Sequence, residues 1–408
     1  MSHDTDPRLS GLIHHPYRAP AGFEAPQGGV YKASTVYFPT VDALRARDWR
    51  EKAGYTYGLH GTPTTYVLEE RIAHLEGGSQ TVLVPSGLSA ISTTALALLS
   101  TGDEVLIPDN AYGPNKALAE GELARMGVSH QLYDPMDVAD LAQRLGPKTR
   151  LVWLEAPGSV TMEFPDLLAQ VRCCRARGVT IALDNTWGAG LAFRPFDLLG
   201  DGTLGVDVSV HALTKYPSGG GDVLMGAITT RNESLHHAIK LCHMRLGLGV
   251  AANDAELILR SLASIGVRYT AQDRAARQLA VWLQAQSFCA QVLHPALSSS
   301  PGHGHWLEVC AQGGHGACGL AAGLFSIILR PGIAQERVDA FLNDLRLFKL
   351  GYSWGGPVSL VVPYELRGMR RRHTPHLHEG ALIRFSLGLE AVDDLIADLD
   401  QSARRHLA

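Results

Sequence analysis

Short apolar runs alternate with helical patterns across residues 80–230, and this alternation limits the possible folds more than any other feature of the chain. The runs read TVLVPSG, DEVLIPD, RLVWLEAPG, VTIALDN, VDVSVHA and VLMGAITT. Apolar strands that alternate with helices are typical of a mostly parallel sheet. We therefore expect residues 61–252 to form an α/β domain built on such a sheet.

Two other regions have a different character. Residues 1–60 are rich in Pro, Gly and aromatic side chains without clear periodicity, which predicts an extended arm that contacts a neighbouring subunit. Helical stretches at 254–265 and 270–286 precede the runs LFSIILR, SLVVPYEL and LIRFSLGL. This order favours a smaller α+β domain over residues 253–408.

Composition narrows the class of protein. The 408 residues are 46% hydrophobic and 19% charged, so the chain can bury a large core. A formal net charge of -4 gives no electrostatic case for a nucleic-acid or anionic-membrane partner, and no apolar run approaches the length of a spanning helix. The polar start MSHDTDPRLS carries no signal-peptide core, so we expect a cytoplasmic protein.

The cysteines, a pair of histidines and a basic run do not indicate a metal site or a disulfide framework. Cys173 and Cys174 are adjacent, and none of the six cysteines has paired ligand spacing, which favours free thiols. His303 and His305 in GHGHW have ligand-like spacing but sit in a Gly-rich segment, so we expect them to be solvated and predict no metal site. The basic run RGMRRRH, residues 367–373, is likewise expected to face solvent.

The segment SVHALTKYPSGGGD places Lys215 between a strand-like run and a glycine-rich turn. About thirty residues upstream, VTIALDNTW ends a second buried strand on Asp184. Strand ends gather the ligand groups of open α/β sheets. Pyridoxal phosphate needs an amine, a carboxylate for its pyridine nitrogen and a phosphate cradle, so the pair predicts this cofactor. Taken singly, Lys215 would be a surface lysine and Asp184 a turn residue.

Three further motifs add candidate ligands. In VPSGLSAI the backbone N–H groups of Gly87 and Leu88 can bind an anion at a helix N-terminus. A simple turn capped by a serine is the alternative. The hydroxyl of Thr214, directly before Lys215, can also reach a phosphate. Tyr112 in IPDNAYGPN either stacks on the pyridine or is a buried structural tyrosine. Arg384 lies in an apolar run and should meet a carboxylate, from the substrate or from the protein.

Several motifs occur together in one order: YGLHGTPTT, PSGLSA, DNAYGPN, EAPGS, LDNTW, TKYPSGGGD, YSWGG and IRFSLGLEAVDDLIADL. With them the chain resembles, over nearly its whole length, the β-lyase branch of the Cys/Met-metabolism pyridoxal-phosphate-dependent enzymes. The resemblance implies the aspartate-aminotransferase-like fold, known as fold type I. That fold has a mostly parallel sheet and a smaller α+β C-terminal domain.

The resemblance also implies roles for the candidate residues. Lys215 would carry the cofactor and act as the general base, while Asp184 would partner the pyridine nitrogen and Tyr112 would stack on the ring. Arg384 would hold the substrate α-carboxylate. The phosphate would be held by Gly87, Leu88 and Thr214.

Other implied roles concern the neighbouring subunit and the substrate. Tyr57 would reach the phosphate of an adjacent chain in a homotetramer that is a dimer of dimers. Ser353, Trp354 and Tyr57 would contact the substrate. Ser353 and Trp354 resemble bacterial β-lyases, because γ-specific relatives tend to carry a small aliphatic residue before the paired glycines. For Trp354 a core aromatic is the alternative.

The implied activity is β-elimination of L-cystathionine to homocysteine, pyruvate and ammonia, in methionine biosynthesis or sulfur amino-acid metabolism. The same scaffold also supports γ-elimination and γ-replacement, so a cystathionine or methionine γ-lyase and a γ-replacement synthase stay as alternatives. A cofactor-free α/β binding protein is the non-enzymatic alternative.

The chain departs from the family pattern at three places. Leu59 stands where an arginine usually binds phosphate across the interface, and neighbouring His60 is a candidate replacement. Ala212 replaces a serine three residues before the lysine, and Val358 replaces an acidic residue after the paired glycines. We expect phosphate affinity and substrate range to differ accordingly.

Overall fold

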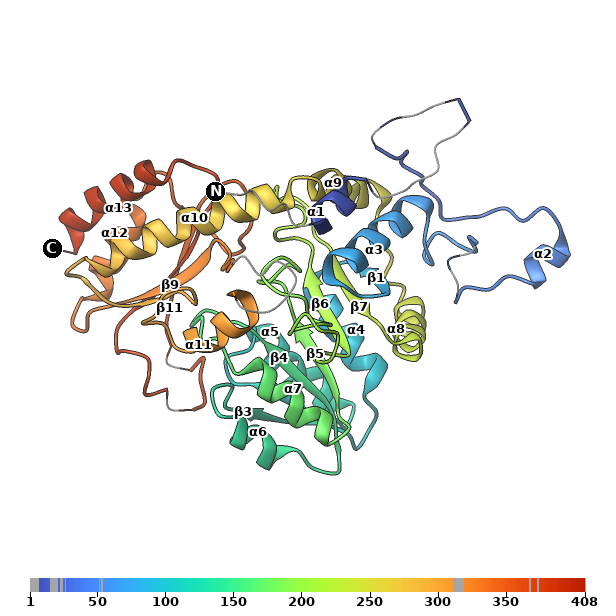
Figure 1. The fold of residues 1–408 in the computed structure, drawn as a ribbon, viewed down its shortest axis with the longest axis horizontal. Helices are drawn as coiled ribbons and strands as arrows, with labels where there is room; N and C mark the ends of the chain where they lie inside the picture. Colours follow the sequence, from blue (N-terminus) through green and yellow to red (C-terminus); the bar gives the residue numbers. More distant parts are fainter. Residues whose placement is uncertain are drawn as a thin grey trace.

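The computed structural model describes residues 7–14, 21–22, 25, 27–50, 52, 54–311, 319–366, 368–372 and 374–407. Two sheets with their helices lie side by side in the molecule (Figure 1). The strands are β1 (Gln80–Val84), β2 (Glu104–Pro108), β3 (Ser129–Tyr133), β4 (Thr149–Glu155), β5 (Thr180–Asp184), β6 (Val208–Ala212), β7 (Gly226–Thr230), β8 (Cys289–Leu293), β9 (Leu324–Leu329), β10 (Lys349–Leu350), β11 (Leu360–Tyr364) and β12 (Leu382–Ser386).

The helices connect and cover these strands. They are α1 (Pro7–Ile13), α2 (Val41–Arg45), α3 (Pro63–Glu76), α4 (Gly87–Leu98), α5 (Gly113–Leu118), α6 (Val138–Arg144), α7 (Leu167–Ala176), α8 (Glu233–Leu246), α9 (Ala252–Leu262), α10 (Ile265–Gln284), α11 (His303–Trp306), α12 (Gln335–Asn343) and α13 (Val392–His406), with π-helical segments η1 (Ala119–Leu123) and η2 (Leu307–Ala311).

The larger sheet has seven strands in the order β1-β7-β6-β5-β4-β2-β3. Only β7 runs antiparallel to its neighbours, so the predicted mostly parallel sheet is confirmed. Alternate side chains of one strand enter opposite cores: Val152 and Leu154 pack on the face that α3 and α7 cover, while Leu151 and Trp153 pack on the face of α4 and α8. Burial on both faces explains why these strands read as continuous apolar runs.

The smaller sheet has five strands in the order β10-β11-β12-β9-β8, and α10, α12 and α13 belong to its core. Strands β9, β11 and β12 match the predicted runs, but β8 was not expected. The helix predicted at 270–286 begins earlier, at Ile265, because buried Ile265 and Tyr269 extend its apolar face. At the edge of the large sheet, β3 was also not expected, since its sequence SHQLY is polar as edge strands often are.

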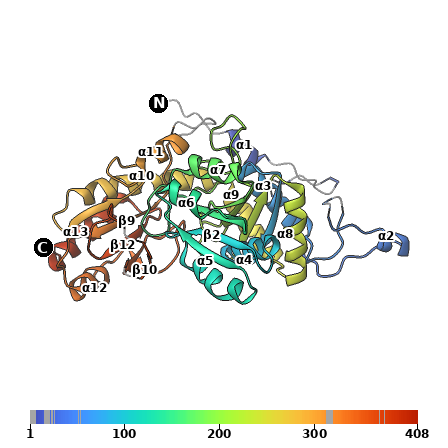
Figure 2. The same ribbon diagram turned by 90° about the horizontal axis from the view of Figure 1, so that it is seen from below.

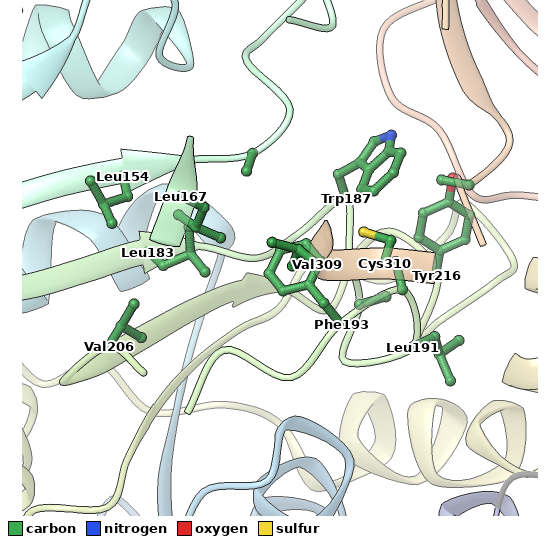
Figure 3. Packing of buried hydrophobic residues seen from close by; sticks show 14 of the residues in the cluster. Leu154, Leu167, Leu183, Trp187, Leu191, Phe193, Val206, Tyr216, Val309 and Cys310 are labelled. Carbon is green, nitrogen blue, oxygen red and sulfur yellow. The ribbon is translucent and has the colours of Figure 1, made fainter. Parts of the chain in front are cut away.

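Aromatic side chains from the segments that follow β5 and β6 pack against residues of the smaller half. Trp187, Phe193 and Tyr216 lie beside Val309 and Cys310 (Figure 3). The Tyr216 hydroxyl accepts a 3.0 Å hydrogen bond from the backbone N–H of Gly323 in the smaller half. Because Tyr216 directly follows Lys215, this packing fixes the backbone that carries the lysine.

The N-terminal region has two parts, one packed on the body of the protein and one projecting from it. Helix α1 packs on α3 and buries Leu12, so this part contacts its own chain, contrary to a wholly extended arm. Residues 27–50, by contrast, project from the body and carry α2 at their far end (Figures 1 and 2). The side chain of Tyr37 is 92% exposed there. None of the helices in the described parts of the chain could cross a lipid bilayer.

The expectation that His303 and His305 are solvated loop residues is wrong in part. Both lie on α11, and each is half-buried. His303 stacks on Trp306 at 5.6 Å between ring centroids and its Nδ1 contacts the carbonyl of Pro295 at 2.9 Å. The described residues contain no cluster of three or more His, Cys, Asp or Glu able to hold a metal. Cys173, Cys174, Cys242 and Cys289 are free thiols, and Cys318 lies outside the described residues.

Candidate active site

A cavity of about 190 Å³ lies at the carboxyl ends of β4, β5 and β6. Strand ends of an open α/β sheet are the usual place for a ligand site. The structure brings most of the predicted residues together here, from both halves of the chain. The cavity is lined by Gly87, Leu88, Tyr112, Asp184, Thr214, Lys215, Trp354 and Arg384.

Lys215 follows β6 and is held by two contacts from the loop after β10. Its Nζ donates a 2.8 Å hydrogen bond to Ser353 Oγ and lies 4.2 Å from the centroid of the Trp354 ring. Burial, together with the nearby Arg384 guanidinium, lowers the pKa of Lys215 to about 8. A fraction of this amine is therefore neutral, and nucleophilic, near physiological pH.

The loop that holds Lys215 has strained backbone. Ser353 has a φ of 111°, which is unusual for a residue with a side chain. Gly355 has a φ of 79°, and a Cβ there would lie 2.8 Å from the backbone nitrogen of Tyr216. Only glycine fits this approach, so the YSWGG sequence can press Ser353 and Trp354 against the lysine.

Asp184 is the last residue of β5, and its Oδ1 accepts a 3.0 Å hydrogen bond from the backbone N–H of Thr186. Burial raises the pKa of its carboxyl group, whereas the buried imidazole of His211 opposes that change. His211 is itself paired with Glu76, at 3.0 Å between Nδ1 and Oε1. The pair is not apparent from the sequence, because Glu76 lies on α3, far from the strand-end motifs.

Glu155 was missed as a functional candidate, although the motif EAPGS contains it. It ends β4 and is in register with Asp184 on β5. Its carboxylate accepts hydrogen bonds from the backbone N–H of Tyr112 at 2.8 Å and from Ser159 Oγ at 2.5 Å. Burial and the adjacent Asp184 raise the pKa of Glu155 to about 8. A carboxylate at a strand end was the signal that could have identified it.

The N-terminus of α4 fits an anion. Ser86 caps the helix by accepting a 3.0 Å hydrogen bond from the N–H of Ser89, and the first turn has no acidic side chain. A Cβ on Gly87 would lie 2.6 Å from the Cβ of Ala212, so the helix start approaches β6 closely only as glycine. Free N–H groups and the helix dipole favour a phosphate at this point.

Thr214 lines the same end of the cavity, but its hydroxyl already has two backbone partners. It donates to the carbonyl of Met225 at 3.2 Å and accepts from the N–H of Met225 at 3.1 Å. Thr186, which was not predicted, also lines the cavity, and its hydroxyl accepts a 3.0 Å hydrogen bond from the N–H of Ala212.

Arg384 lies in the middle of β12 with only 6% of its surface exposed. Its guanidinium lies 5.4 Å from the Trp354 ring and 5.3 Å from the Tyr364 ring. Its Nη2 reaches the carbonyl of Ser353 only at 3.5 Å. No ion pair found among the described residues includes Arg384. Its planar fork is therefore available for the carboxylate of a ligand.

The structure of one chain does not bring Tyr57 into the cavity. Tyr57 is 46% exposed on the segment that leads from the projecting arm. Leu59 packs near Gly249, whose added Cβ would lie 3.2 Å from Leu59 Cδ1. His60 Nδ1 contacts Thr56 Oγ1 at 2.7 Å, and burial and Lys240 lower its pKa. A neutral His60 does not replace the charge of an arginine.

A second cavity of about 550 Å³ adjoins the first and shares Tyr112, Lys215, Trp354 and Arg384 with it. It is bounded by a short strap, residues 368–372. The expectation that the basic run 367–373 faces solvent is wrong for Arg370, whose side chain is 8% exposed, whereas Gly368 and Arg371 are exposed as expected. Residues 367 and 373 lie outside the described part of the chain. The strap side chains form ion pairs with carboxylates of the larger half: Arg370 with Glu163, Arg371 with Glu120 and Arg372 with Asp140.

Comparisons with known proteins agree with this geometry. A family model described as Cys/Met metabolism PLP-dependent enzyme matches residues 10–404. A cystathionine beta-lyase from Bordetella avium is 37% identical over 99% of this chain and 100% of its own length. A putative cystathionine beta-lyase from Rhizobium johnstonii is 39% identical over 91% of this chain and 89% of its own. The crystal structure of a cystathionine gamma synthase from Xanthomonas oryzae superposes with a TM-score of 0.85 at 26% identity, over 98% of both chains.

Proposed function

The chain belongs to the Cys/Met-metabolism family of pyridoxal-phosphate-dependent enzymes, and from this premise we propose that it is a carbon–sulfur lyase acting on L-cystathionine. The reaction consumes water and yields homocysteine, pyruvate and ammonia. The observation that carries the proposal is the position of Lys215 between Ser353 and Trp354, in one cavity with Asp184 and Arg384.

The residues present fit the cofactor. The start of α4 provides free N–H groups for a phosphate, and Asp184 provides a buried carboxyl for a pyridine nitrogen. Tyr112 lines the cavity at the start of α5, and its backbone is fixed by Glu155. When bound, pyridoxal phosphate supplies an electron sink for negative charge at the substrate α-carbon.

Each side chain of the site has a separate role in the reaction. Arg384 binds the substrate α-carboxylate and so orients the α-carbon–hydrogen bond towards Lys215. Neutral Lys215 Nζ removes the α-proton, and its lowered pKa suits a general base near neutral pH. Ser353 holds the amine in place through the 2.8 Å contact. Loss of the thiol from the β-carbon completes the elimination.

Two alternatives from the same family, γ-elimination and γ-replacement, would use the same Lys215 and Asp184. The bulk of Trp354 over the amine supports β-elimination, because it narrows the space around the position from which Lys215 acts. This support comes from one side chain, so product analysis is the direct test.

The test incubates purified enzyme with L-cystathionine and measures pyruvate and 2-oxobutanoate side by side. β-Elimination yields pyruvate with an equal amount of homocysteine. A γ-lyase would instead yield 2-oxobutanoate and cysteine, and a replacement synthase would form a new thioether when a second thiol is added. Pyruvate as a minor product would overturn the proposal.

We propose further that residues 1–60 form an arm contacting a neighbouring subunit, residues 61–252 a cofactor domain and residues 253–408 a smaller domain, in a homotetramer. The projecting segment 27–50 and the position of Tyr57 outside its own cavity support this assembly. With Leu59 in place of an arginine, Tyr57→Phe should weaken cofactor retention, and Leu59→Arg should strengthen it. Sedimentation of the protein with and without cofactor tests the assembly; a fully active monomer would contradict it.

The cellular setting we propose is the cytoplasm, with a role in methionine biosynthesis. The names of the similar cystathionine beta-lyases support the pathway. Complementation of a methionine auxotroph that lacks this activity tests the role in methionine biosynthesis. Cell fractionation tests the cytoplasmic location.

A further inference from the structure

The guanidinium of Arg384 is held by aromatic rings rather than by a carboxylate. Its central carbon lies 5.4 Å from the centroid of the Trp354 ring and 5.3 Å from that of the Tyr364 ring. A cation within about 6 Å of a ring centroid is attracted by the negative face of the ring. No ion pair found among the described residues includes Arg384, although only 6% of its surface is exposed. A carboxylate partner would occupy N–H donors of the fork, whereas a ring face stabilises the charge and leaves those donors for a ligand.

The pairing of β11 with β12 brings Tyr364 to this arginine. In the antiparallel register Val362 lies opposite Arg384, and Tyr364 is two residues further along β11. Residues on this diagonal share one face of the sheet and are within reach of aromatic and long side chains. That face turns towards the larger half, because Tyr364 packs against the cluster that contains Leu154 and Leu183 of the larger sheet. The position of the ring is therefore set by strand register.

Tyr364 differs from Trp354 in what else it affects. Trp354 lines both cavities, and its ring lies 4.2 Å from Lys215 Nζ. Tyr364 lines the second cavity but not the first. Burial lowers the pKa of Arg384, and the nearby Tyr364 side chain opposes that change. A substitution of Tyr364 therefore acts on the cation and leaves the contacts of Lys215 with Ser353 and Trp354 in place.

We propose that Tyr364 is a positioning residue for substrate binding, because its ring fixes the Arg384 guanidinium in the orientation that receives a carboxylate. The proposal rests on the function proposed above, in which Arg384 binds the substrate α-carboxylate. Without the ring, the guanidinium would have to be ordered each time a substrate binds, which costs affinity. Proton transfer at Lys215 would be unchanged. Loss of the ring should therefore raise KM and leave kcat close to that of the parent enzyme.

The direct test measures the binding of L-alanine and of ethylamine, which differ only in the α-carboxylate. Neither has a leaving group at the β-carbon, so neither undergoes elimination, and the absorbance of the bound cofactor reports the binding of each amine. Because the contact lies in a desolvated site, Tyr364→Leu should weaken L-alanine binding about 10-fold. Ethylamine, which has no carboxylate for Arg384, should bind this variant within about 2-fold of the parent affinity.

Tyr364→Phe and Val362→Ala are the matched variants. Tyr364→Phe keeps the ring and should restore L-alanine binding to within about 3-fold of the parent value. Val362→Ala removes buried packing directly opposite Arg384 but no ring, so the ratio of the two amine affinities should not change. Thermal unfolding and cofactor absorbance check that each variant is folded and loaded, and Tyr364→Met serves if the leucine variant is unstable. Equal losses in Tyr364→Phe and Tyr364→Leu, or a selective loss of L-alanine binding in Val362→Ala, would overturn the proposal.

A double-mutant cycle tests whether Tyr364 acts through Arg384. In the parent background, Tyr364→Leu should lower kcat/KM for L-cystathionine about 10-fold, mainly through KM. In an Arg384→Met background the cation is absent, so the same substitution should cost less than about 2-fold. Equal losses in the two backgrounds would show that Tyr364 acts independently of Arg384. A fall in kcat alone would contradict the positioning role as well.

The amine-binding experiment also separates the positioning role from the proposed reaction. If L-cystathionine yields no pyruvate but Tyr364→Leu weakens the binding of L-alanine and not of ethylamine, the proposed function fails and the positioning role stands. If pyruvate forms but Tyr364→Leu binds both amines as the parent enzyme does, the positioning role fails alone.

Discussion

The two sides of the active site are built in different ways. On the cofactor side, Gly87, Glu155, Asp184 and Lys215 end or follow strands of the seven-stranded sheet, and hydrogen-bonded register fixes their spacing. On the substrate side, Ser353, Trp354 and the strap lie on loops of the smaller half, held by strained backbone and by ion pairs.

Because of this difference, the residues that transfer protons are held by the sheet, whereas the residues that select the substrate lie on loops. Proton transfer requires positions accurate to a fraction of an ångström, which a buried sheet supplies. Substrate choice can be changed by altering loops without disturbing that sheet. Arg384 is the exception, since it stands on β12 and yet contacts the loop residues Ser353 and Trp354. We therefore expect substitutions on the cofactor side to lower kcat and substitutions on the substrate side to change KM.

The largest effect is expected at Lys215, where the two sides meet. Lys215→Ala removes the general base, so turnover should fall at least ~10²–10⁴-fold while the fold is retained. Initial rates of pyruvate formation measure this effect. Lys148→Ala, at an exposed lysine outside both cavities, is the control. Near-normal turnover in Lys215→Ala would exclude the assigned base.

The next effect tests the cofactor side alone. Asp184→Asn keeps the shape of the side chain but removes the charge that would hold a proton on the pyridine nitrogen. We expect kcat to fall roughly 100-fold with little change in KM, because the lost interaction strengthens in the transition state. Steady-state kinetics separate the two constants. A raised KM with unchanged kcat would place Asp184 in substrate binding instead.

A smaller effect of the opposite kind is expected on the substrate side. Arg384→Lys keeps the charge but loses the planar fork, so KM should rise about 10-fold while kcat changes less. The same variant should unfold close to the parent temperature, since Arg384 has no ion-pair partner among the described residues to leave behind. A loss of stability without a change in KM would show that Arg384 has a structural role.

The smallest effect concerns the apoenzyme and its pH dependence. At a pH well below the ordinary pKa of a glutamate, Glu155 is protonated in both the folded and the unfolded chain. Towards pH 8 the unfolded carboxyl is ionised while the folded one still holds its proton, so folding becomes costlier. Glu155→Gln removes this cost and should raise the unfolding free energy by at least about 1 kcal/mol more at pH 8 than at pH 5. Urea unfolding at the two pH values measures the difference, with exposed Glu122→Gln as control.

The sequence predicts the cofactor side better than the substrate side, for a physical reason. Lys215 and Asp184 stand next to their own strands, so local pattern and residue type together mark them. Arg370, Glu163 and Asn110, which are joined by hydrogen bonds, come from three distant segments, and each is unremarkable in its own segment. Their contact depends on how the two halves pack, which local pattern does not encode.

The wrong and missed assignments follow the same division. The basic run was expected in solvent because charged runs usually are, but buried carboxylates such as Glu163 bind it to the other half. Strand β8 has the sequence CAQVL, in which Gln291 interrupts the apolar residues, so neither a continuous apolar run nor a regular alternation marks it. The departure at Leu59 stays a prediction. The pKa of neighbouring His60 is lowered by burial and by Lys240, which lies on the distant helix α8.

The position of β1 has a consequence for how the protein is made. This first strand of the large sheet lies at the edge of the described sheet, where its neighbour is β7, which ends at Thr230. Until residues 226–230 have been synthesised, β1 lacks its partner strand in the described sheet. The strand β7 that joins β1 to β6 is then missing, so Gly87 is not yet held against Ala212. Long-range pairing of this kind is slow and leaves an apolar edge exposed to other chains. Cofactor capture is therefore a late event in biogenesis, and a chain halted before residue 226 is prone to aggregate.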